Sequence, residues 1–140
     1  MKRLMIVTAF LLVAGIAFGQ TLKKGCVIGV HHMTDIVLAE GATMDDFIEF
    51  NLQKYIPAFE KALPGVKVFL VKGNRGEEED NLGMIYYCES VKVRDQYWPE
   101  KDVTSEKANA ALETHVAPVM EEYDKIVKSM SSGHTDWTLL

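Results

Sequence analysis

The chain has 140 residues, of which 48% are apolar and 25% charged, and its 20 acidic and 15 basic side chains give a formal net charge of −5. This length and apolar content suit one small globular domain. The acidic balance argues against a protein that binds nucleic acid or an anionic membrane through a basic surface.

The N-terminus has the pattern of a secretory signal peptide. Lys2 and Arg3 precede an uncharged apolar run over residues 4–18, shorter than the roughly 20 residues that span a bilayer. Ala17 and Gly19 provide small side chains three residues and one residue before the expected cleavage point. We therefore expect a signal peptide over residues 1–19 and a single domain over residues 20–140, exported to the periplasm or the extracellular space. A retained membrane anchor is the alternative.

Cleavage after Gly19 would make the product more acidic. Removal of Lys2 and Arg3 would leave 13 basic and 20 acidic side chains, a net charge of −7. The expected domain is therefore a poor candidate for binding nucleic acid or, after cleavage, a membrane.

The first half of the expected domain predicts a strand followed by a helix. Residues 25–38 are rich in β-branched side chains and contain no proline, which favours a strand. Thr43 and Asp46 have the spacing of a capping box, and Pro64-Gly65 is a stop signal. The helix between them carries one apolar stripe: Phe47, Ile48, Leu52, Tyr55, Ile56, Phe59 and Leu63.

The second half predicts two strands, a helix and a last strand. Residues 66–72 and a segment within 81–93 read as a hairpin, with the acidic run 77–80 at its solvated tip. Ser105 can cap a helix that ends near residues 131–133, and residues 134–140 follow as a short strand. The order strand, helix, strand, strand, helix, strand is the ferredoxin-like pattern, an α+β fold with two helices on one face of a four-stranded antiparallel sheet.

Two features bear on what the domain could hold. Pro57 and Pro118 lie at similar depths in the two helices and should bend each of them, which leaves either a pocket between helices and sheet or a filled core. The strands also carry apolar residues on both faces. Cys26, Ile28, Val30 and Ile36 alternate with Val27, Met33 and Val37 in the first strand. Because two helices cover only one face, we expect the second face to pack against another copy of the chain.

This arrangement resembles the dimeric α+β barrel superfamily over residues 25–140. The resemblance rests on element order and two-faced strands, with the segments 89–91 and 94–99 also similar to it. It implies a homodimer whose sheets form a shared barrel. Members include cofactor-independent monooxygenases, haem-degrading oxygenases, haem peroxidase-like enzymes and non-catalytic proteins, so the resemblance does not select one activity.

The histidines are the first candidates for chemistry. His31 and His32 are adjacent on a strand, so their side chains leave opposite faces and cannot share one metal ion without a bulge. We assign His32 to the face that the helices cover and His31 to the subunit interface. His115 lies beside the apolar stripe of the second helix, where it could approach His32. His134, after Gly133, reads as a turn residue.

The expected pocket residues are His32, Tyr86, Trp98 and His115. In some haem-binding relatives a helix histidine ligates the iron, so the resemblance makes His115 a candidate haem ligand; a histidine hydrogen-bonded at the core margin is the alternative. Trp98 could close the pocket as a lid or plug the end of the core.

Two cysteines remain outside the signal, and no set of residues has metal-site spacing. Cys26 and Cys88 are both assigned to the helix side of neighbouring strands, so an oxidising compartment would allow a disulfide if the register brings them together. The chain has no GxSxG, phosphate-binding glycine loop, HExxH or CxxC motif. We therefore expect no metal and, haem apart, no cofactor.

Three functions stay open. The first is a dimeric domain that binds a small apolar or aromatic molecule between helices and sheet. The second is an enzyme, either a cofactor-independent monooxygenase or a haem-binding or haem-degrading protein, in which His32 and His115 meet in one cavity. The third is a structural interaction module, which predicts a filled core.

Overall fold

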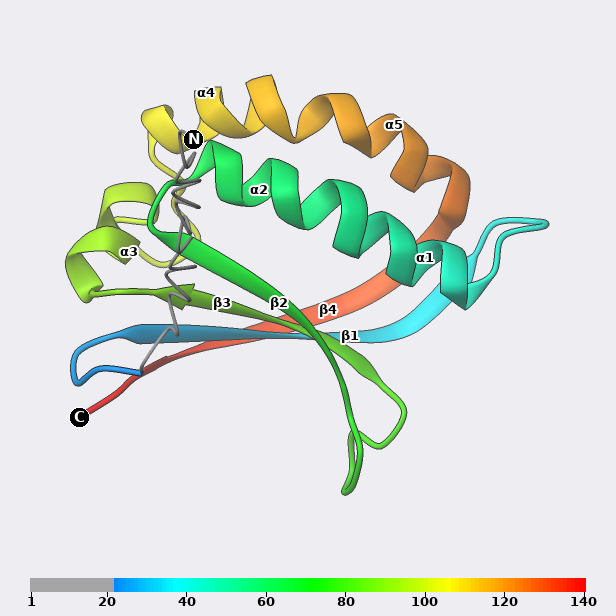
Figure 1. Ribbon diagram of the computed structural model, residues 1–140, viewed down its shortest axis with the longest axis horizontal. Helices are drawn as coiled ribbons and strands as arrows, with labels where there is room; N and C mark the ends of the chain where they lie inside the picture. The colour runs from blue at the N-terminus through cyan, green and yellow to red at the C-terminus, as the bar shows by residue number, and fades with distance from the viewer. Residues whose placement is uncertain (1–21) are drawn as a thin grey trace, which may run out of the picture.

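The sheet has four strands, and a computed structural model describes it within residues 22–140 (Figure 1). The strands are β1 (Val27–Leu38), β2 (Val66–Lys72), β3 (Leu82–Cys88) and β4 (Val127–Thr138). They pair antiparallel in the order β2-β3-β1-β4, so β4 and β2 form the edges. This is the ferredoxin-like strand order, as predicted.

The predicted signal peptide lies outside the described residues. Within residues 22–140, no helix is long and apolar enough to cross a membrane.

Two long helical segments cover one face of the sheet (Figure 1). The first consists of α1 (Met44–Phe50), a π-helix η1 (Asn51–Tyr55) and α2 (Ile56–Ala62); the second consists of α4 (Glu106–His115) and α5 (Ala117–Ile126). The predicted capping box is present, because the Thr43 hydroxyl accepts from the Asp46 backbone N–H at 3.2 Å and the Thr43 N–H donates to the Asp46 carboxylate at 2.7 Å.

Both helical segments change at their prolines, as expected from the missing proline N–H. Pro57 is in the first turn of α2, which directly follows the π-helix, and the wider turn of the π-helix accommodates the lost hydrogen bond. Pro118 is in the first turn of α5, after a break at Val116. The prolines therefore divide each segment into two pieces that together curve over the sheet.

The second half differs from the prediction in two places. A short helix α3 (Val91–Tyr97), capped by Ser90, lies where the sequence suggested strand and irregular link. The second helix ends at Ile126, and β4 starts at Val127, so His134 is a strand residue and not a turn residue. The helical spacing of Val127 and Met130 from Tyr123 suggested a longer helix, but backbone pairing with β1 governs these residues.

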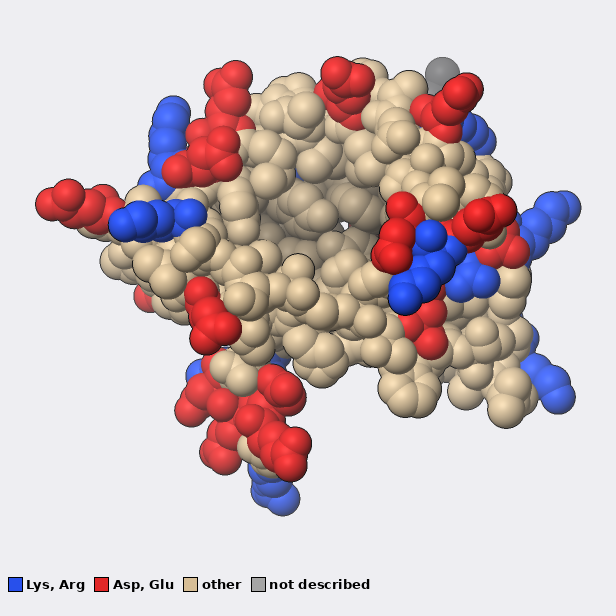
Figure 2. Space-filling model, turned by 180° about the vertical axis from the view of Figure 1, so that it is seen from behind, with Lys and Arg blue, Asp and Glu red and all other residues tan. Residues whose placement is uncertain are grey.

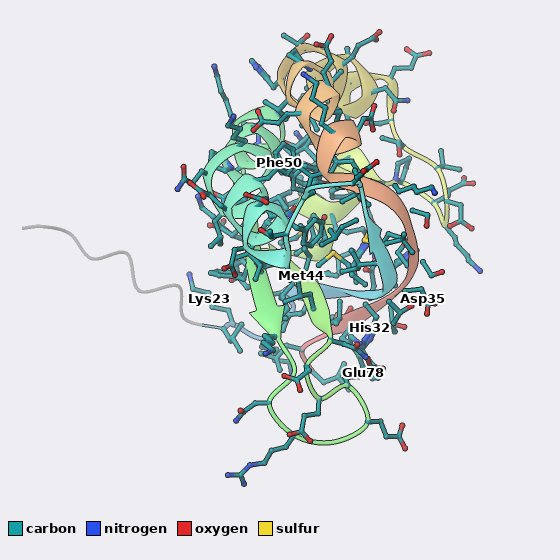
Figure 3. All side chains as sticks on the ribbon, turned by 90° about the vertical axis from the view of Figure 1, so that its right-hand side faces the viewer. Lys23, His32, Asp35, Met44, Phe50 and Glu78 are labelled. Carbon is teal, nitrogen blue, oxygen red and sulfur yellow. The ribbon has the colours of Figure 1, made fainter. Side chains whose placement is uncertain are left out.

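The faces of β1 before Asp35 are the reverse of the prediction, whereas Ile36 lies on the helix side as predicted. Asp35 has a left-handed backbone (φ 50°), and the β1–β4 register shifts there, which marks a β-bulge. The bulge puts Ile36 on the core side together with Met33 and Val27, whereas Ile28 and Val30 face away. His31 therefore faces the helices, and His32 lies on the outer face, where Figure 3 shows it beside Glu78.

The core fills the space between the helices and one part of the sheet. Figure 3 shows Phe50 pointing into this layer, and Phe47, Leu63 and Val66 are fully buried in it. No helix within residues 22–140 lies over the outer face of the sheet (Figure 1). Large apolar side chains are exposed there, including Trp137 (61% exposed), Phe69 (47%) and Val71 (36%). The sheet is thus apolar on both faces, as the sequence predicted.

Candidate functional site

A cavity of about 820 Å³ lies between the helices and the sheet, beside the end of the core that α3 closes. Figure 2 shows the molecule hollowed at this level, with acidic and basic side chains gathered at one side of the hollow. Its wall is formed by Phe59 of α2, Leu112 of α4, residues 98–102 and Thr104 of the link after α3, and the inner face of β1, β3 and β4. The expected pocket between helices and sheet is therefore present, next to a filled core.

Strand register decides which sheet residues form the cavity floor. His31 and Gly29 of β1 lie between Tyr86 of β3 and the β4 residues His134 and Asp136. Gly29 pairs with Tyr86 on one side and Asp136 on the other. A Cβ atom at Gly29 would lie 2.9 Å from the Asp136 Oδ1. Because Gly29 has no side chain, the Asp136 carboxylate has room to lie against β1 at this position.

Aromatic rings form one wall of the cavity. The Phe59 ring lies 5.2 Å from that of Tyr86 in an edge-on arrangement and 6.3 Å from that of Trp98 in a nearly parallel one, both between centroids. The Tyr86 hydroxyl lies 3.3 Å from that of Tyr55 and donates to the Met84 Sδ, also at 3.3 Å. Burial raises the pKa of both tyrosines, so both stay protonated.

Two histidines form the adjoining edge. The His31 ring stacks on that of His134 with a 5.0 Å centroid separation and lies 4.7 Å from that of Tyr86. Burial lowers the pKa of His31 from 6.5, the nearby His134 lowers it further, and Asp136 partly opposes the shift. His31 is therefore neutral at neutral pH and can accept a hydrogen bond or a proton.

An ion pair joins α3 to β4 at the polar end of the cavity. The Arg94 guanidinium binds the Asp136 carboxylate at 3.1 Å and the Asp95 carboxylate at 2.5 Å. Cys88 also lines this end, and burial, with Asp136 as a second cause, raises the pKa of its thiol to about 11. The thiol is thus protonated and does not act as a nucleophile at neutral pH.

The predicted pocket residues divide into two groups. Tyr86 and Trp98 line the cavity. His32 does not, because it faces away from the helices, with its Nδ1 3.9 Å from the Glu78 carboxylate. His115 ends α4 outside the cavity lining. The structure therefore does not bring His32 and His115 together, and haem ligation by His115 stays a prediction without support from the cavity.

The two cysteines are not cross-strand partners. Cys88 lies opposite Val27 in β1, so the neighbouring Cys26 is out of register with it, and both thiols are free. The assignment of Cys26 and Cys88 to one face was wrong by one residue, which is enough to prevent a disulfide in this geometry. Residues 22–140 contain no group of three or more side chains that could hold a metal ion.

Several cavity residues were missed in the sequence: His31, His134, Gly29, Phe59, Arg94 and Asp136. Phe59 was assigned to the core, in which it also takes part. A glycine inside a strand signals close approach of another group, so Gly29 could have been recognised. Arg94 could have been found through the Ser90 cap of α3. For His31 the bulge at Asp35 concealed the correct face.

The comparisons with known proteins give only distant likenesses. No family model and no curated protein matches the chain. SnoaB, a cofactor-independent oxygenase from Streptomyces nogalater, is 14% identical, with a TM-score of 0.45 over 83% of this chain and 94% of that chain. A dimeric protein of unknown function and ferredoxin-like fold from Bacteroides fragilis is 12% identical, with a TM-score of 0.39 over 83% and 98%. A NIPSNAP family protein from Agrobacterium tumefaciens is 9% identical, with a TM-score of 0.43 over 86% and 90%. Such likenesses carry no activity over to this chain, whose fold is assigned from its own strand order.

Proposed function

We propose that this protein is an exported homodimer that binds a small planar aromatic molecule between its helices and sheet. The observation that carries the proposal is the 820 Å³ cavity walled by the rings of Phe59, Tyr86 and Trp98. This volume lies within the range of small-molecule sites, about 300–1,000 Å³. Stacked and edge-on aromatic walls favour flat ligands. The cavity also argues against a purely structural module, which would fill its core.

The two tryptophans allow a controlled binding test. Trp98 lines the cavity, whereas Trp137 is exposed on the outer face. The neutral dye N-phenyl-1-naphthylamine, whose fluorescence rises in apolar surroundings, should bind the wild type and Trp137→Ala alike. Its affinity should fall in Trp98→Ala, because one wall of the cavity is lost. Failure of the dye to bind the wild type, or an equal loss of affinity in both variants, would contradict the proposal.

The homodimer is proposed from the outer face of the sheet, which no helix within residues 22–140 covers. Phe69 and Val71 of β2 and Trp137 of β4 expose apolar area there, and a second copy would bury it. Val71→Lys should therefore give a monomer by analytical ultracentrifugation. Val103→Lys is the matched control, since Val103 is similarly exposed (43%) outside the sheet. A monomeric wild type would refute the dimer.

Export is proposed from the sequence of the N-terminus. Expression of the full chain in a bacterial host should give a periplasmic protein whose N-terminal sequence begins at Gln20. Recovery of the uncleaved chain in the membrane fraction would favour the retained anchor instead.

A cofactor-independent oxygenase is the second candidate, and neutral His31 in the cavity is the observation that favours it. Such an enzyme needs a base that takes a proton from a hydroxylated aromatic substrate before oxygen reacts. His31 lines the cavity and its lowered pKa leaves the imidazole neutral, so it can take this proton, whereas the raised pKa of Cys88 makes its thiol unsuitable. Oxygen uptake with 1,5-dihydroxynaphthalene that depends on the protein and is lost in His31→Gln would establish the activity. A rate equal to that of buffer would exclude it for this substrate.

A further inference from the structure

The polar end of the cavity is poorly suited to an anion. Arg94 and Lys101 are its basic side chains, and Glu100, Asp102 and Asp136 its acidic ones. The Arg94 guanidinium is already bound to two carboxylates, those of Asp95 and Asp136. A ligand carboxylate would therefore compete with protein carboxylates for the same guanidinium and would meet an excess of negative charge.

The edge of the cavity beside the aromatic wall presents a hydrogen-bond acceptor in His31. No residue within 22–140 makes a hydrogen bond with the His31 ring, whose neighbours are the rings of Tyr86 and His134. In the described part of the chain, every fully buried side-chain nitrogen or oxygen has a hydrogen-bond partner, so a ring nitrogen without one is not fully buried. The His31 nitrogens are therefore accessible from the cavity that this residue lines. A neutral imidazole has one acceptor nitrogen and one N–H donor.

The other polar group near the aromatic wall is already used. The Tyr86 hydroxyl donates to the Met84 Sδ and lies beside the Tyr55 hydroxyl. Its hydrogen bonds are directed toward Tyr55 of η1 and Met84 of β3, so a ligand that lies against the Tyr86 ring has the His31 imidazole beside it as a polar partner.

We propose that the ligand is a neutral planar aromatic molecule with a hydroxyl or N–H group at its edge, and that His31 selects it by accepting a hydrogen bond from that group. This inference rests on the proposed aromatic-binding function and names the ligand class. Aromatic acids are excluded by charge. Purely apolar aromatics bind less well because they leave the imidazole acceptor without a hydrogen-bond partner.

Three matched probes separate these cases in isothermal titration calorimetry at about pH 7.5, well below the pKa of about 10 typical of a phenol. The probes share the naphthalene ring system. 2-Naphthol carries a hydroxyl donor, naphthalene carries no polar group, and 2-naphthoate carries a carboxylate. The wild type should prefer 2-naphthol over naphthalene by roughly three- to tenfold, the effect of one net hydrogen bond, and should bind 2-naphthoate weakest.

The adjacent histidine provides the control variant. His31→Phe should lose the preference for 2-naphthol while retaining affinity for naphthalene, and His31→Gln, which keeps an acceptor, should retain part of the preference. His32→Phe, on the outer face, should behave as the wild type. If His31→Phe fails to fold, His31→Leu removes the acceptor with a smaller side chain.

The outcomes distinguish the inference from the function beneath it. Failure of all three probes to bind the wild type would overturn aromatic binding itself. Binding of naphthalene with no preference for 2-naphthol, or with 2-naphthoate preferred, would overturn the ligand class and leave aromatic binding standing. A preference that survives in His31→Phe, or disappears equally in His32→Phe, would overturn the role of His31.

Discussion

Substitution of Gly29 by alanine tests the cavity floor at its tightest point. The new Cβ would lie 2.9 Å from the Asp136 Oδ1 and 3.7 Å from the Tyr86 Cβ. The second distance is ordinary contact, but the first requires the carboxylate to move. Because Asp136 also accepts from the Arg94 guanidinium at 3.1 Å, its displacement would weaken the link between β4 and α3.

The free energy of unfolding should change little in Gly29→Ala, because two effects of similar size oppose each other. Replacing a glycine that has an ordinary backbone conformation stabilises a fold by about 0.4–1 kcal/mol, because the unfolded chain loses freedom. Loss of a partly exposed ion pair costs about 0–1 kcal/mol, which leaves the free energy of unfolding of Gly29→Ala close to that of the wild type. Gly133→Ala is the matched control in the neighbouring strand, since a Cβ there meets nothing within 4 Å. It should show the stabilisation alone.

Urea unfolding followed by tryptophan fluorescence would measure both variants, and a double variant isolates the contact. With Asp136→Ala in the background, Gly29→Ala should gain the stability that Gly133→Ala shows, because the carboxylate that blocks the Cβ is gone. The reasoning is refuted if Gly29→Ala alone is as stabilising as Gly133→Ala. A loss above about 3 kcal/mol would refute it as well, since only displaced backbone or core would explain it.

Three further predictions concern the fold and its pH dependence. Thr43→Ala should lower the free energy of unfolding by about 1 kcal/mol at neutral pH. Hydrogen bonds from Thr43 lower the pKa of Asp46, so the part of the cap that depends on the Asp46 carboxylate should be present above the ordinary pKa of 3.8 and be lost as the pH falls through the lowered pKa, a loss that urea titration in acid would detect. Phe47→Ala, at a fully buried core position, should cost about 3–5 kcal/mol by the same assay, and a cost under about 1 kcal/mol would contradict the packing. Burial lowers the pKa of His31, so as the pH falls the unfolded chain binds a proton there before the folded chain does, and the free energy of unfolding of the wild type should fall below pH 6.5. His31→Gln should show a smaller fall. An equal dependence of stability on pH in the wild type and the variant would contradict the burial of His31.

The first half of the domain follows closely from local sequence signals. The Thr43 and Asp46 capping box and the Pro64-Gly65 stop bound a helix whose stripe residues Phe47 and Phe59 lie in the core. These signals act within a few residues of where they occur, so they can be recognised without knowledge of the rest of the chain. The π-helix before Pro57 is a local consequence of the proline as well.

The second half depends on contacts that the sequence does not display. β4 contains few apolar residues, because an edge strand exposed along most of its length needs few, and so it lacks the alternation by which strands are recognised. Its length is set by pairing with β1. The same pairing brings His134 against His31 and makes both of them cavity residues.

A single backbone irregularity accounts for most of the error in the candidate site. Side chains alternate along a strand, so one extra residue at Asp35 reverses the relation between Ile36 and the residues before it. Ile36 is a core residue, and counting back from it without a bulge places His32 and Cys26 on the helix side in place of His31 and Val27.

The reversal also gives the site its best internal control. His31 and His32 are chemically identical and adjacent, and they differ in which face of the sheet they occupy. A property that depends on the cavity should respond to His31 alone, whereas one that depends on the outer face or on the acidic hairpin tip should respond to His32. Because substitution at either position removes the same imidazole from the same strand, any difference between the two variants reports the face and not the residue type.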